Sequence, residues 1–170
     1  MTVNISSTEC APCAIGKYQG GTGQSACFDC EPGKFIAMNG STSCASCLSG
    51  KHAPLQGSSS CDACLAGSYS SESARDCMAC DKGKASSVDG SASCASCLPG
   101  KHSPSTRASS CDECLAGSYS SEGAWGCVAC PDGFFSEAIG SSSCTACEAG
   151  TMTVNISSTE CAPCAIGKYQ

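Results

Sequence analysis

The sequence predicts a small disulfide-rich fold: an elongated tandem array of 16–17-residue CxxCxxG modules, built from short β-strands and loops without helices. The first observation behind this prediction is that all 20 cysteines of the 170-residue chain belong to CxxC pairs. The second is that large apolar side chains are scarce, since only 5% of the residues are aromatic. Small units that bury little apolar surface usually depend on disulfides or metals for their stability.

The repeat divides the whole chain. Successive CxxC pairs start 16 or 17 residues apart, and each is followed by two residues and a glycine. We expect the glycine to form a turn with positive φ, and the residue two positions later, usually Tyr, Phe or Met, to pack over the module's disulfides. Such a fixed period indicates a stack in which each repeat contacts its neighbours. The ten glycines are Gly16, Gly33, Gly50, Gly67, Gly83, Gly100, Gly117, Gly133, Gly150 and Gly167.

A longer period lies above the module. Residues 152–170 reproduce residues 1–19 without a substitution, which is a period of 151 residues or nine modules in three groups of three. We predict that residues 1–9 end one module, that residues 10–160 hold nine modules, and that residues 161–170 begin the next period. The simplest interpretation is a window on a longer array. The alternative is a 170-residue protomer with duplicated ends.

Uniform repetition restricts the disulfide pairing. Modules that paired two by two could not repeat every 151 residues, because nine modules per period is an odd number. Of the patterns that are the same for every module, the shortest joins the second Cys of one CxxC to the first Cys of the next. A loop of about 15 residues closed in this way contributes on the order of 3 kcal/mol. Cys10 and Cys164 are then left over, and the expected bridges are Cys13–Cys27, Cys30–Cys44, Cys47–Cys61, Cys64–Cys77, Cys80–Cys94, Cys97–Cys111, Cys114–Cys127, Cys130–Cys144 and Cys147–Cys161.

Two segments carry a family resemblance: Cys13-Ala-Ile-Gly-Lys-Tyr18 followed by Cys27, and Cys64-Leu-Ala-Gly-Ser-Tyr69 followed by Cys77. This CxxGxY pattern resembles the ephrin-receptor-like cysteine-rich repeat, and it is similar to the simplest modules of tumour-necrosis-factor-receptor ectodomains. The resemblance implies the same ladder of bridges and an extracellular setting. Ala85, His52 and His102 depart from the aromatic position of the pattern.

Several other sites and activities are disfavoured. Four thiolates from two CxxC pairs can hold zinc, but an unbroken train of ten pairs without histidine ligands favours disulfides. A thioredoxin-like redox site would need a βαβ setting, which the chain lacks. The net charge of −6 and the scattered basic residues disfavour nucleic-acid binding, and no apolar run is long enough to span a membrane. We therefore expect no metal, no cofactor and no enzymatic activity.

All three asparagines lie in N-x-S/T sequons, at Asn4, Asn39 and Asn155. We expect them to face solvent, and at least one to carry a glycan in a secreted protein. A strand from Met152 to Ser157 would place Asn155 on its solvent face. Serine clusters are either O-glycan sites or ordinary soluble loops, and serine and threonine in general should wet a surface that has few charges.

Two further groups of residues stand out. His52 and His102 lie 50 residues apart in equivalent GKH positions, and we interpret them as surface residues rather than a ligand pair. Six large apolar residues are too bulky for such short loops to bury alone. Because exposed apolar patches usually mark contacts, we expect interfaces between modules or strands at Phe35, Ile36, Trp125, Phe134, Phe135 and Ile139.

Two functions of different kinds follow. The first is a structural extracellular glycoprotein that forms or extends a fibre, appendage or wall filament, with copies of itself or further repeats of the same chain as partners. A long period repeated without change suits a material made of equivalent parts. The alternative is the stalk or ectodomain of a cell-surface adhesin or receptor, whose modules usually diversify because ligands contact particular ones.

Overall fold

The structure, a computed structural model, describes residues 10–166 and contains no helix in that range. It confirms the predicted fold class, because the described chain is a series of disulfide-closed modules with one antiparallel two-stranded hairpin each. None of its segments is a helix that could cross a membrane. The hairpins are β1 (Lys17–Tyr18) with β2 (Phe28–Asp29), β3 (Lys34–Phe35) with β4 (Ala45–Ser46), β5 (Lys51–His52) with β6 (Asp62–Ala63), β7 (Ser68–Tyr69) with β8 (Met78–Ala79), β9 (Lys84–Ala85) with β10 (Ala95–Ser96), β11 (Lys101–His102) with β12 (Asp112–Glu113), β13 (Ser118–Tyr119) with β14 (Val128–Ala129), β15 (Phe134–Phe135) with β16 (Thr145–Ala146), and β17 (Thr151–Met152) with β18 (Ala162–Pro163).

Each hairpin starts at the glycine of the repeat. In the module that holds β11 and β12, Gly100 has a φ of +83°, a left-handed conformation that glycine adopts without the steric cost of a Cβ. The turn lets the amide of Lys101 donate to the carbonyl of Leu98 at 2.9 Å. The amide of Cys114 then donates to the carbonyl of Gly100 at 2.9 Å and closes the hairpin. The positive φ expected for the repeat glycines is confirmed at nine of them, all those in the described residues.

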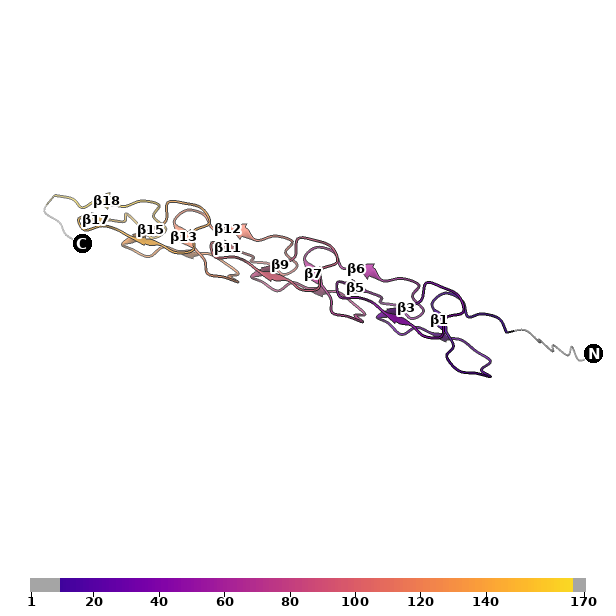
Figure 1. Ribbon diagram of the computed structural model, residues 1–170. Coiled ribbons are helices and arrows are strands. Elements are labelled where there is room, and N and C mark those ends of the chain that lie inside the picture. Colours follow the sequence, from indigo (N-terminus) through magenta and orange to yellow (C-terminus); the bar gives the residue numbers. More distant parts are fainter. Residues whose placement is uncertain (1–9, 167–170) are drawn as a thin grey trace, which may run out of the picture. The chain divides into compact units, whose positions relative to one another are not determined.

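The chain divides into two compact units. The first consists of residues 1–64 and 70–77, and the second of residues 65–69 and 78–170. Strands β1 to β6 belong to the first unit, and β7 to β18 belong to the second. Within each unit the hairpins follow one another in chain order (Figure 1).

Backbone hydrogen bonds join successive modules inside each unit. The amide of Gly100 donates to the carbonyl of Ser120 in the next module at 2.9 Å. The amide of Gly123, in the turn of the following loop, donates back to the carbonyl of Cys97 at 2.8 Å. The same pair of contacts recurs in the first unit, for example from Gly33 to Ala53 and from Gly57 to Cys30. Stacking therefore relies mainly on main-chain atoms; the exception is Gly133, whose amide donates to Thr153 Oγ1 at 2.8 Å.

In the eight modules from Gly33 to Gly150, the position three residues after the repeat glycine is buried, whereas Gln19 in the first module is half-buried. The buried position holds small or β-branched residues that are at most 7% exposed: Ile36, Ala53, Ser70, Ser86, Ser103, Ser120, Ser136 and Thr153. Their hydroxyls bond to the backbone, as when Ser70 Oγ donates to the carbonyl of Lys51 at 2.9 Å. Every buried side-chain oxygen and nitrogen within residues 10–166 has a hydrogen-bond partner. The expectation that serine serves to wet the surface is therefore wrong for these serines, which line the core.

The strand considered for Met152–Ser157 is also shorter than expected, because β17 ends at Met152. Thr153 enters the buried position, and the chain then turns through Ser157, whose φ is +62°. The amide of Ser157 donates to the carbonyl of Cys130 at 3.0 Å. This hydrogen bond holds the segment against an earlier module. An extended strand could not make this contact.

Candidate functional site: a disulfide ladder with two histidine contacts

Nine disulfides run through the described chain, and each joins the two cysteines that the ladder pattern pairs. Their Cα–Cα distances are 5.7 or 5.8 Å, within the usual range for a disulfide. Cys10 is exposed and Cys164 is half-buried, and both are free thiols. In seven bridges the first cysteine is at most 1% exposed: Cys30, Cys47, Cys64, Cys80, Cys97, Cys114 and Cys130. Because large apolar side chains are few, buried cystines occupy the interior of the modules in place of an apolar core.

In three modules the residue two positions after the repeat glycine lines a surface hollow together with a cysteine of the following module's bridge. Tyr18 and Cys44 line one surface hollow of about 310 Å³. Tyr69 and Cys94 line a second, of about 120 Å³, and Phe135 and Cys161 line a third. The sequence predicts that these side chains pack over the module's disulfides. In the three hollows the cysteine that lies with them belongs to the bridge of the next module.

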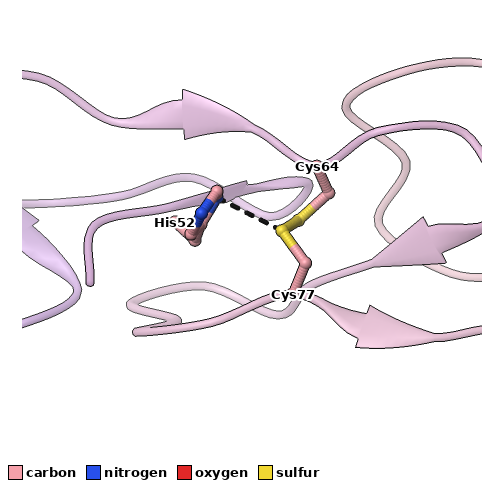
Figure 2. A group of neighbouring side chains, drawn as sticks. All are labelled: His52, Cys64 and Cys77. Atoms are coloured by element: carbon pink, nitrogen blue, oxygen red, sulfur yellow. Dashed lines mark hydrogen bonds between the residues drawn. A yellow bond between two sulfur atoms is a disulfide. The ribbon is translucent and has the colours of Figure 1, made fainter.

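His52 and His102 occupy this position and touch a bridge sulfur. His52 Nδ1 lies 3.2 Å from Cys77 Sγ and 3.1 Å from the carbonyl oxygen of Asp62, and Figure 2 shows the ring directed at the Cys64–Cys77 bridge. His102 Nδ1 lies 3.2 Å from Cys127 Sγ. Both histidines are half-buried, and each contacts a cystine, a contact that the interpretation as surface residues does not include.

The carbonyl contact identifies the ring nitrogen that carries hydrogen. A carbonyl oxygen only accepts hydrogen bonds, so His52 Nδ1 must donate its hydrogen toward Asp62. The sulfur of a cystine is likewise an acceptor, and it shares that N–H. His102 makes the equivalent carbonyl contact, to Asp112 at 3.2 Å. Both imidazoles therefore present an N–H to a disulfide sulfur.

The same residues could in principle ligate a metal ion. Ligand atoms of His52, Cys64 and Cys77 lie within 4.8 Å of one another, and His102, Cys114 and Cys127 form the matching group. A cysteine binds metal as a thiolate, whereas here the two sulfurs of each group are bonded to one another. The oxidised ladder thus leaves only the imidazole as a strong donor. With their cysteines oxidised, these two groups do not have the ligands of a metal centre.

The six apolar residues expected at interfaces have different surroundings. Ile36 fills the buried position and is 5% exposed, while Phe35 and Phe135 are half-buried. Phe134, Trp125 and Ile139 are exposed, Trp125 by 68%. The ammonium of Lys82, two modules earlier, lies 6.0 Å from the centroid of the Trp125 ring, within reach of a cation–π contact. The structure therefore brings Ile36 into the stack and leaves much of Trp125, Phe134 and Ile139 uncovered.

The sequon asparagines that the structure describes are accessible. Asn39 and Asn155 are both exposed and lie outside the strands. Asn155 Oδ1 and its carbonyl oxygen accept from Ser158 Oγ, at 3.2 and 2.6 Å, which orders the side chain at the surface. Asn4 lies outside the described residues.

The comparison with known families agrees with this geometry. The sequence model of the family described as tyrosine-protein kinase ephrin type A/B receptor-like matches residues 1–43 and 117–160, just over half of the chain. The chain belongs to this family of cysteine-rich repeats. No curated protein matches it. The ephrin-receptor-like repeat is an extracellular, ectodomain-type module, in keeping with a chain whose described part is held by nine disulfides.

Proposed function

We propose that this ephrin-receptor-like chain is a structural extracellular glycoprotein that forms or extends a fibre, appendage or wall filament, and that it has no catalytic role. Its partners are copies of itself or further repeats of the same chain. The observation that carries the proposal is the stacking contact between modules. It is made largely by main-chain atoms of the repeat glycine, of the buried position and of a cysteine, so it depends little on the other side chains of a module.

The exposed apolar side chains supply a surface for association. Trp125 and Ile139 are 68% and 63% exposed, and Phe134 is 41% exposed. All three belong to the second unit and lie within the one complete 151-residue period that the chain contains. Burial of such side chains is worth about 1.5–3 kcal/mol each. Contacts of this size, repeated at every period, would hold filaments together laterally.

Sedimentation of the oxidised chain tests the proposal. We expect concentration-dependent association that the variant Phe134→Ser/Ile139→Ser weakens. Both side chains are exposed, so the variant should keep its nine bridges, which peptide mapping would verify. The control Leu48→Ser changes a residue in the first unit that is more exposed than either, at 69%, and should associate like the parent chain.

The second candidate is a stalk or ectodomain of a surface adhesin or receptor, which the family match favours because the repeat is named for receptor ectodomains. A parent chain that stays monomeric at high concentration, together with native material that images as isolated projections, would support the stalk and contradict the filament.

Glycans at the sequons complete the proposal. Asn39 and Asn155 are exposed, and a glycan at either position would keep the surface around it hydrated. Treating native material with an amidase that releases N-glycans should shift the mass of peptides containing Asn4, Asn39 or Asn155. Unmodified asparagine at all three positions would contradict the glycoprotein part of the proposal.

A further inference from the structure

The two bridges beside histidine differ from the other seven. In the described residues, the position that packs on the following bridge otherwise holds Tyr, Phe, Ala or Met, and no hydrogen bond from those side chains to a bridge sulfur is found. Only His52 and His102 place an N–H against sulfur, at 3.2 Å in both cases. The chain has two histidines in total, and both are used in this way.

We propose that Cys64–Cys77 and Cys114–Cys127 are thiol-exchange sites, at which a small extracellular thiol opens the bridge while the other seven bridges stay closed. The substrate class is a low-molecular-weight thiol that reacts as its thiolate. The imidazole N–H distinguishes these two bridges from the other seven, because a thiolate accepts a hydrogen bond much more strongly than the sulfur of an intact disulfide does. The N–H therefore stabilises the open form more than the closed form.

Burial selects which sulfur reacts first. Cys64 and Cys114 are fully buried, whereas Cys77 and Cys127 are half-buried. The external thiolate therefore attacks Cys77 Sγ and forms a mixed disulfide with it. The Sγ–Sγ bond of Cys64–Cys77 breaks, and its electron pair passes to Cys64 Sγ, which takes a proton from water.

A second external thiolate completes the exchange. It attacks the external sulfur of the mixed disulfide, so that the two small thiols leave as their own disulfide. The electron pair of the broken bond passes to Cys77 Sγ, which departs as a thiolate and accepts the N–H of His52. Two thiols are oxidised and one cystine is reduced, and a good leaving thiolate speeds this step.

The backbone holds each imidazole in place for this role. The amide of Ala53, next to His52, donates to the carbonyl of Ala74 at 3.2 Å, three residues before Cys77. Residues His52 and Ala74 also form a parallel β-bridge. In the second unit, the amide of Ser103 donates to the carbonyl of Ala124 at 3.2 Å, again three residues before the reactive cysteine. The ring thus needs no rearrangement to meet the thiolate.

The test measures the reduction of all nine bridges in one chain. The full 170-residue chain is first treated with N-ethylmaleimide to block Cys10 and Cys164, and is then incubated in glutathione buffers of increasing reducing strength. Isotopically distinct alkylation before and after complete reduction reports the open fraction of each bridge. We expect Cys64–Cys77 and Cys114–Cys127 to open at a thiol-to-disulfide ratio roughly tenfold lower than the other seven. Glutathione adducts should appear on Cys77 and Cys127.

The matched variant is His52→Phe, because phenylalanine fills the same position at Phe35 and Phe135 without disturbing their bridges. It should return Cys64–Cys77 to the behaviour of the other seven bridges while Cys114–Cys127 stays sensitive, and His102→Phe should do the reverse. Equal opening of all nine bridges would overturn the proposal. Cys64–Cys77 and Cys114–Cys127 also join cysteines 13 residues apart, against 14 in the other seven bridges. Sensitivity of Cys64–Cys77 that persists in His52→Phe would therefore also overturn the proposal, because the shorter loop rather than the imidazole would then be the cause.

Discussion

Glycine at the repeat position meets two separate requirements. Gly100 needs a positive φ to start its hairpin, and it also lies against the turn of a module two places further on. A Cβ built on Gly100 would overlap the carbonyl oxygen of Gly140. The sequence predicts the first requirement, because CxxCxxG recurs ten times, but it cannot predict the second. That contact joins residues 40 apart, and it depends on the angle at which modules stack.

The variants Gly100→Ala and Gly150→Ala separate the two requirements. Both glycines have a φ near +83°, but nothing lies within 4 Å of a Cβ at Gly150. We expect Gly150→Ala to cost about 1–2 kcal/mol, the strain of the left-handed backbone alone. Gly100→Ala should cost clearly more, because Gly140 must also move. Opening free energies from amide hydrogen exchange would measure both, and equal costs would contradict the close packing.

Serine at the buried position is the residue that sequence reasoning missed. A serine-rich chain looks like a soluble surface, and composition does not separate Ser120, which is 1% exposed, from its exposed neighbour Ser121. The signal was available in the spacing, because the position three residues after each glycine is small or β-branched from Ile36 to Thr153. Whether this position is buried depends on which side of the hairpin packs against the next module. A two-residue strand has no alternating pattern of apolar and polar residues that would indicate the buried side.

The variant Ser120→Ala tests the role of this position. Ser120 Oγ donates to the carbonyl of Lys101 at 3.0 Å. Its loss leaves a partly buried acceptor without that partner, at a cost of about 1 kcal/mol. Ser121→Ala, one residue along and exposed, should change stability by less than about 0.5 kcal/mol. Hydrogen exchange of the β13–β14 hairpin would report the difference, and equal effects would contradict a core role for Ser120.

At the scale of the element, each hairpin is closed by one disulfide bridge. The uniform repeat and the family resemblance together suggest the pairing of cysteines, and the structure contains the same pairs. The strands were harder to predict, because two residues are too few for periodicity to mark where a strand begins or ends. Met152–Ser157 shows the difficulty: its alternating residues suit a longer strand, but contact with Cys130 ends the strand at Met152.

Peptide mapping under non-reducing conditions tests the ladder directly. We expect each second cysteine of a CxxC to pair with the first of the next, as in Cys13–Cys27. A Cys10–Cys27 or Cys13–Cys30 peptide would contradict it. Elemental analysis belongs in the same experiment, because the oxidised chain should contain no stoichiometric zinc. A chelator should leave hydrogen exchange unchanged, whereas a strong reductant should abolish protection.

At the scale of the whole molecule, stability should be local rather than cooperative. The contacts that join modules reach only the next one or two repeats, as Gly100 does with Ser120 and Gly140. A chain of this kind behaves approximately as a sum of modules and nearest-neighbour interfaces. Residues 10–166 contain no single core whose loss would unfold every module together. This follows from the composition, which the sequence shows plainly, and from the range of the contacts, which only the structure shows.

Removal of one bridge tests this locality. The variant Cys97→Ser/Cys111→Ser should lose on the order of 3 kcal/mol, because the loop between the two cysteines is no longer closed in the unfolded chain. Amide exchange should rise in the β11–β12 hairpin and in the modules stacked directly on it. The β17–β18 hairpin, in the same unit but farther along the chain, should keep its protection. Cys147→Ser/Cys161→Ser is the reciprocal control, since it should expose β17–β18 and leave β11–β12 protected. If either variant unfolds the whole second unit in one step, the modules share a cooperative core and the nearest-neighbour description fails.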